Sequence, residues 1–146
     1  MKQRKDRGLA RRLGPVGPFL AAAFLLANAA RSQDARISEF MAINDSFWQD
    51  RDGEYSDWIE LQNLTASNIS LSGWSLTDSA AAPRKWVFPA VTLPARGFLV
   101  VFASGKDRTN ALAELHTNFK LDGGGEYLAL VRPDGSVADE FSPAYP

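Results

Sequence analysis

Two short segments of alternating apolar and polar residues constrain the fold of this chain more than any other feature. They are Asp57–Leu61 and, ten positions later, Leu71–Asp78. Alternation with a period of two is typical of a strand with one buried face, and Asn, Thr and Ser between the segments favour a connecting loop. Only the adjacent pair Trp58 and Ile59 breaks the alternation. The two segments therefore predict half-buried strands that pair in a sheet.

Similar patterns recur along the chain, separated by turn residues about every 8 to 12 positions. The apolar run Phe98–Phe102 predicts a central strand buried on both faces. A short helical turn is expected at Thr109–Leu115, and Pro133–Ser136 predicts a hairpin turn. The predicted strands are Ile37–Ala42, Asp57–Asn63, Ile69–Asp78 with a bend at Gly73, Lys85–Phe88, Phe98–Phe102, Thr117–Leu121, Tyr127–Val131 and Val137–Phe141. About eight short strands predict an all-β sandwich, with a barrel as the alternative.

The first 29 residues differ in composition from the rest of the chain. A basic run ends at Arg12, and an uncharged apolar stretch follows from Pro15 to Ala30. Ala27 and Ala29 fit the small-residue spacing that signal peptidase reads, so residues 1–29 predict a signal peptide cleaved after Ala29. An uncleaved membrane anchor is the alternative, but the stretch is shorter than the roughly 20 residues that a spanning helix needs. The expected location is secreted or cell-envelope, with membrane contact only through the transient export signal.

Removal of residues 1–29 makes the remaining chain acidic. Those residues hold 6 of the 16 Lys and Arg residues and 1 of the 17 Asp and Glu residues, which leaves 10 basic and 16 acidic residues. Nucleic-acid binding rests largely on Lys and Arg that meet phosphates, and the remaining basic residues are scattered. Nucleic acid is therefore disfavoured as a partner, and Lys106-Asp107-Arg108 is the one local basic patch.

An acidic loop precedes the strand at Asp57 and offers oxygen ligands of the kind that calcium takes. The candidate ligands are Asp50, Asp52, Glu54 and Asp57, with Gly53 as a turn residue. An EF-hand frame is not met, because the twelfth residue counted from Asp50 is Leu61 rather than Glu. A solvated acidic turn is the favoured interpretation, and calcium is the alternative. No other cofactor is expected.

Four tryptophans raise the question of a sugar-stacking surface. Trp58, Trp74 and Trp86 fall inside strand patterns, which favours core packing. Trp48 follows Phe47 in the polar loop, so this pair is the candidate ligand contact.

The sequence offers little material for catalysis. The chain has no Cys and one His, His116. Ser104, His116 and Asp107 can be combined into a triad on paper, but no nucleophile-elbow sequence supports it. A hydrogen bond that anchors a turn is the favoured role of His116. The chain is predicted not to be an enzyme.

Several motifs in a fixed order closely resemble the lamin-tail domain, in the form found in bacterial exported proteins. The resemblance covers roughly residues 36–146 and implies an immunoglobulin-like antiparallel β-sandwich that is a non-catalytic module. Such domains usually continue beyond the point that Tyr145-Pro146 reaches, so the sandwich is expected at 37–146 with a truncated C-terminus, after a polar lead at 30–36. The motifs are Ile37–Ala42, Asp57–Asn63, Leu71–Asp78, Lys85–Pro89, Leu99–Gly105, His116–Leu121 and Pro133–Asp139.

The leading functional hypothesis is an exported binding or structural module that mediates protein–protein or surface assembly. Its loops and free sheet edges are the expected contact surfaces. One alternative is a carbohydrate-binding module, calcium-dependent or not, that binds a polysaccharide through Trp48 and the acidic loop. Another is an accessory domain of a larger exported hydrolase.

Overall fold

Residues 33–146 are the part of the chain that the computed structural model describes, and all of their regular secondary structure is β-strand. The signal peptide predicted at residues 1–29 lies outside this part. The ten strands are β1 (Ala35–Met41), β2 (Asp57–Asn63), β3 (Ile69–Ser70), β4 (Ser75–Thr77), β5 (Trp86–Val87), β6 (Thr92–Leu93), β7 (Phe98–Ala103), β8 (Leu115–His116), β9 (Leu128–Val131) and β10 (Val137–Phe141).

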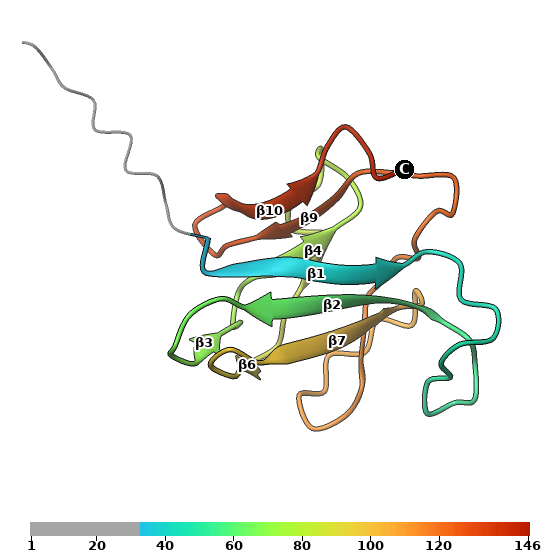
Figure 1. The fold of residues 1–146 in the computed structure, drawn as a ribbon, viewed down its shortest axis with the longest axis horizontal. Coiled ribbons are helices and arrows are strands. Elements are labelled where there is room, and N and C mark those ends of the chain that lie inside the picture. The colour runs from blue at the N-terminus through green and yellow to red at the C-terminus, as the bar shows by residue number, and fades with distance from the viewer. Residues whose placement is uncertain (1–32) are drawn as a thin grey trace, which may run out of the picture. The chain divides into compact units, whose positions relative to one another are not determined.

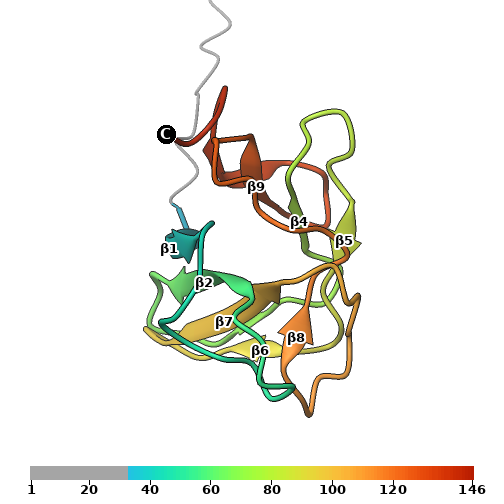
Figure 2. The ribbon, with the colours of Figure 1, turned by 90° about the vertical axis from the view of Figure 1, so that its right-hand side faces the viewer.

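The strands form two four-stranded sheets, in the orders β1-β2-β7-β8 and β10-β9-β4-β5, and a small β3-β6 pair (Figure 1). Figure 2 shows the two larger sheets as separate layers, which is the predicted sandwich. The predicted antiparallel pairing needs one correction, because β7 and β8 are parallel. The loop at residues 104–114 carries the chain back so that Leu115 pairs beside Val101.

Strand β2 matches its predicted bounds and explains the break in the alternation. Ile59 and Leu61 are fully buried in the core between the sheets. Neighbouring side chains of a strand point to opposite faces, so Trp58 lies on the outer face, where it pairs across the strands with Phe102 of β7. Both Trp58 and Ile59 are apolar because both faces of the sheet are covered at this point.

The core residues come from both sheets. Strand β9 is buried along its whole length, since it lies between β10 and β4 and packs toward the first sheet. Trp74 and Trp86 are buried in this core, and Trp58 is buried outside it, which confirms the predicted packing role of the three tryptophans.

The predicted strand Ile69–Asp78 divides at Gly73, which has a positive φ of 77°. The backbone N–H of Trp74 donates to the carbonyl of Leu71 at 2.9 Å, so the chain turns here. Before the turn β3 pairs with β6, and after it β4 pairs with β9 and β5. The bend is thus confirmed, but the segments on its two sides belong to different sheets.

Three other predictions of local structure are wrong. Strand β7 is not buried on both faces throughout, because Phe98 is 52% exposed at its start. Residues 109–114 form a loop with turns rather than a helical turn, Leu115 begins β8, and Leu112 in this loop is 93% exposed. The segment Thr117–Leu121 contributes only an isolated bridge between Lys120 and Ser104.

The edge strands β1 and β10 lie against each other where the two sheets meet. The Asp139 carboxylate of β10 accepts a hydrogen bond from the backbone N–H of Ile37 at 2.9 Å. The ring of Phe40 packs on Phe141 and on Tyr145, with centroid distances of 5.0 and 4.6 Å. This part of the sheet edge is therefore occupied by the protein's own side chains.

Candidate functional site

The loop between β1 and β2, residues 42–56, is held in one conformation by a buried amide. The Nδ2 of Asn44 donates to the carbonyls of Trp48 and Ser56, at 2.7 and 2.8 Å. Its Oδ1 accepts from the backbone N–H groups of Phe47 and Trp48, at 3.1 and 3.4 Å. An amide side chain often bonds nearby backbone in this way, and here it fixes both the start and the end of the loop.

A cluster of five charged side chains joins this loop to the loop at residues 104–114. We call it the Lys106 cluster, and its members are Asp50, Asp52, Glu54, Lys106 and Arg108. The Lys106 Nζ lies 2.5 Å from Asp50, 2.6 Å from Asp52 and 2.9 Å from Glu54. Arg108 contacts Asp52 at 2.8 Å. The two loops are close because Asp57 pairs with Ala103, so the chain entering β2 lies beside the chain leaving β7.

Burial and hydrogen bonding have opposite effects on the pKa values of this cluster. The Asp50 side chain is fully buried, which by itself raises its pKa, but hydrogen bonds from Lys106, the Glu54 backbone and Ser56 lower the pKa overall. Hydrogen bonds from Arg108 and Lys106 lower the pKa of Asp52 to about 2. Burial also opposes the charge of Lys106, yet hydrogen bonds to the three carboxylates raise its pKa. Asp50, Asp52 and Lys106 are therefore charged at neutral pH.

Three of the four predicted calcium ligands therefore surround an ammonium group. Asp50, Asp52 and Glu54 all contact Lys106, whereas Asp57 accepts a hydrogen bond from the backbone N–H of Asn44 at 3.2 Å. Within residues 33–146 no group of three or more His, Asp or Glu residues is arranged to hold a metal ion. Calcium at these residues stays a prediction, and it requires displacement of the Lys106 ammonium.

The loop presents apolar side chains to solvent. Phe47 is 73% exposed and Trp48 is 43% exposed. The ring of Trp48 makes edge-type contacts with Trp58 and Phe102, with centroid distances of 6.3 and 5.6 Å. Trp48 is therefore both an anchor of the loop on the outer face of the sheet and a partly accessible ring.

The predicted hydrogen-bonding role of His116 agrees with its contacts. Its Nδ1 lies 2.9 Å from the Oγ of Ser104, and its ring stacks on Phe102. The buried Nε2 has no partner among the described residues, so no carboxylate orients the ring as a triad requires. Burial, followed by the charges of Lys106 and Arg108, lowers the pKa of His116. The ring is neutral at pH 7.

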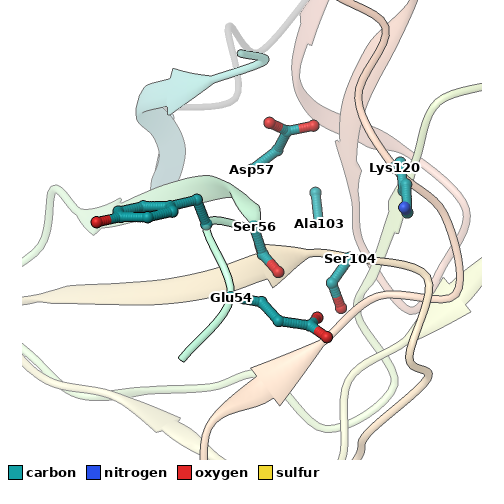
Figure 3. A pocket seen from close by; sticks show the side chains of 7 residues that line it. Glu54, Ser56, Asp57, Ala103, Ser104 and Lys120 are labelled. Carbon is teal, nitrogen blue, oxygen red and sulfur yellow. The ribbon is translucent and has the colours of Figure 1, made fainter. Parts of the chain in front are cut away.

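A pocket of about 140 Å³ lies beside the Lys106 cluster. Figure 3 shows Asp57, Ala103 and Lys120 on its walls, with Glu54, Ser56 and Ser104 below them. The register brings these segments together, because Asp57 pairs with Ala103 and Ser104 pairs with Lys120. The lining residues are Glu54, Tyr55, Ser56, Asp57, Ala103, Ser104 and Lys120.

Comparison with known families identifies the domain. The family model described as Lamin Tail Domain matches residues 28–144. The chain belongs to the lamin tail domain family. The curated proteins contain no match to the chain. Lamin tail domains are immunoglobulin-like and usually non-catalytic interaction modules, which agrees with the sandwich observed here.

In this lamin tail domain the basic patch at residues 106–108 has a structural role that the sequence did not reveal. Lys106 and Arg108 are neutralised by the acidic loop rather than exposed together for phosphate. One loop is acidic and the other is basic. Together with the register of β2 and β7, this opposite charge could have predicted the ion pairs between the two loops. Asn44 gave no such signal, because nothing in its neighbourhood distinguishes it from an ordinary turn residue.

Among residues 33–146, none forms a helix of the length and apolarity that crossing a membrane requires.

Proposed function

We propose that this lamin tail domain is a non-catalytic module that binds another protein through the loop at residues 42–56. The observation that carries the proposal is the exposure of apolar side chains on a loop that is held rigid. Exposed contiguous apolar side chains on a soluble domain mark interaction sites, and binding residues are often on loops fixed by a scaffold. The exposed side chains are Ile43 (64%), Phe47 (73%), Trp48 (43%) and Tyr55 (45%).

The rigidity of the loop lowers the entropic cost of binding. Asn44 and the Lys106 cluster fix its conformation, and the backbone N–H of Arg51 donates to Glu114 at 2.8 Å. A surface ordered in advance loses less conformational freedom when a partner binds. The loop is therefore better suited to recognition than a free segment of the same composition.

Site-specific photo-cross-linking tests this proposal. A photoreactive residue at position 47 is expected to capture a specific protein partner in the producing cells. A matched probe at Val137, an exposed residue of β10, is the control. Addition of Asn44→Ala to the position-47 probe is expected to remove the product, since the loop then loses its internal bonds. Equal products at positions 47 and 137, or none at 47, contradict the proposal.

Carbohydrate binding is a second candidate because the ring of Trp48 is partly accessible. A polysaccharide pull-down that succeeds with the unmodified chain and fails with Trp48→Phe favours this function. Phe retains the aromatic packing on Trp58 and Phe102 better than Ala, so a loss of binding reports on the indole. A pull-down that is equal for both proteins, or absent for both, argues against it.

Export of the domain is part of the same proposal. The basic and apolar segments of residues 1–29 and the small residues at Ala27 and Ala29 support a cleaved signal peptide. Mass spectrometry of the extracellular or envelope fraction is expected to find a mature N-terminus at Ala30. Recovery of the intact N-terminus from the cytoplasm alone contradicts export. An accessory role beside an exported hydrolase is a separate proposal.

A further inference from the structure

The pocket beside the Lys106 cluster contains two opposite charges that do not pair with each other. Asp57 and Lys120 both line it, and Figure 3 shows them on either side of Ala103. Of the nine Lys and Arg side chains in the described part of the chain, only that of Lys120 makes no hydrogen bond or ion pair with a described group. Lys120 is therefore a free ammonium at the wall of a pocket.

Asp57 lacks a cationic partner as well. Its carboxylate accepts hydrogen bonds from the backbone N–H groups of Asn44 and Leu121. Burial is the largest influence on it and raises its pKa, against the smaller opposing effects of these bonds and of the Lys120 charge. The ionised carboxylate is thus less stable here than in water, and a cation that entered the pocket would stabilise it.

The size and lining of the pocket restrict what can enter. A volume of about 140 Å³ is similar to that of an engineered cavity of roughly 150 Å³ that holds a molecule as small as benzene. The small side chain of Ala103 leaves this space open, and the hydroxyls of Ser56 and Ser104 are at its wall (Figure 3). The pocket therefore suits a compact polar molecule rather than a large apolar one.

We propose that this pocket binds the zwitterionic group of an α-amino acid, with its ammonium toward Asp57 and its carboxylate toward Lys120. A ligand whose ammonium and carboxylate groups are attached to one carbon can pair with Asp57 and Lys120 at the same time. An ion of a single sign leaves either Asp57 or Lys120 without a partner. The third charged residue of the pocket, Glu54, is already paired with Lys106. This binding does not depend on the protein partner proposed for the loop.

Nuclear magnetic resonance titration of the full chain tests the proposal. Glycine is expected to produce saturable amide shifts centred on Asp57, Ser104 and Lys120. Acetate and methylammonium, which each carry one of the two charges, are expected to produce no saturation over the same range. Nε-acetyllysine has the same zwitterion on a longer tail. Tighter binding of it than of glycine indicates a ligand group at the end of a longer molecule, and equal binding indicates a free amino acid.

Three variants test the roles of the residues. Asp57→Asn and Lys120→Gln are each expected to weaken glycine binding about tenfold or more, because each removes a charge-assisted hydrogen bond. Ala103→Val is expected to block binding by filling the pocket. Lys85→Gln, at a cation paired with Asp78, is the matched control and is expected to bind normally.

The proposal is overturned if glycine gives no saturable shift with the folded chain. It is also overturned if acetate or methylammonium binds as tightly as glycine, or if neither Asp57→Asn nor Lys120→Gln weakens binding. Amide spectra verify the fold of each variant. Asp57→Asn and Lys120→Gln change different segments of the chain, so a folding defect in one does not imply a defect in the other.

Discussion

The core between the sheets and the loop end of the domain, which consists of the loops at residues 42–56 and 104–114, are stabilised in different ways. The core is closed by apolar side chains such as Ile59 and Leu130, which lose all contact with water. The loop end is closed by Asn44 and the Lys106 cluster, where hydrogen bonds and ion pairs offset the cost of burying polar groups. The comparison shows that one domain uses non-directional burial for its frame and directional polar contacts to fix the surface it presents.

The largest expected effect is a cavity in the core. Leu130→Ala is predicted to lower the free energy of unfolding by about 3 kcal/mol, because it removes a fully buried side chain from β9. Urea denaturation measures the change. Leu112→Ala, at a side chain that is 93% exposed, is the matched control and is expected to change stability by less than about 0.5 kcal/mol. Similar losses for both variants would contradict the assignment of β9 to the core.

Loss of the ammonium at the loop end is predicted to have a smaller effect. Lys106→Met leaves the buried carboxylate of Asp50 without a cation, and a loss of about 2 kcal/mol is expected. The loss stays below that of a fully buried pair because Asp50 keeps hydrogen bonds from Asp52, Glu54 and Ser56.

The control for this variant is Lys85→Met, which breaks a more exposed pair with Asp78 and is expected to cost less than about 1 kcal/mol. Urea denaturation of both variants gives the comparison. If Lys106→Met is no more harmful than Lys85→Met, the Lys106 cluster does not stabilise the fold.

Acid is predicted to weaken the loop end through His116. Its folded pKa is lowered, so the unfolded chain takes up the proton first, and stability should fall as the pH drops below about 6.5. The loss is at most about 1.4 kcal/mol for each pH unit within this window. Urea denaturation between pH 7.5 and 5.5 checks it, and His116→Gln is expected to abolish the slope. An unchanged slope in that variant would assign the effect to another group.

The smallest expected effect concerns Asp57. Its folded pKa is raised, so its stabilising contribution is present at acid pH and is lost as the pH rises through that pKa. Asp57→Asn should therefore leave stability at pH 7 unchanged or raise it by up to about 1 kcal/mol, and this gain should shrink toward pH 4. Thermal or urea unfolding at both pH values measures it. A marked loss of stability at pH 7 would show that the carboxylate supports the loop end instead.

The fold was largely predictable because strand alternation is a local property. The bounds of β2 and β10 and the bend at Gly73 were all correct. The prediction for β7 failed because the sequence does not show how many faces of a strand are covered by other parts of the chain. Phe98–Phe102 has the composition of a strand buried on both sides, but its outer face is covered only near Phe102, where Trp48 packs.

The candidate site was predictable only in part. The sequence located the acidic loop and the exposed pair Phe47 and Trp48, since polar runs and unpatterned aromatics are visible without a structure. It did not reveal that Lys106, 52 positions after Glu54, lies among the carboxylates. That contact depends on the register between β2 and β7, which fixes the two loops side by side.

The sequence by itself determined the longer strands such as β2 and β10, the family and the acidic character of the domain, because alternation, motif order and charge are properties of short segments. Only the tertiary structure decided the environment of each polar group. It paired Asp50 with Lys106, left Asp57 and Lys120 unpaired in one pocket, and covered Trp58 with the loop that precedes it. These outcomes depend on which distant segments of the chain are in contact. The burial of a polar group and its interaction energy with other charges are set by these contacts rather than by the residue type alone.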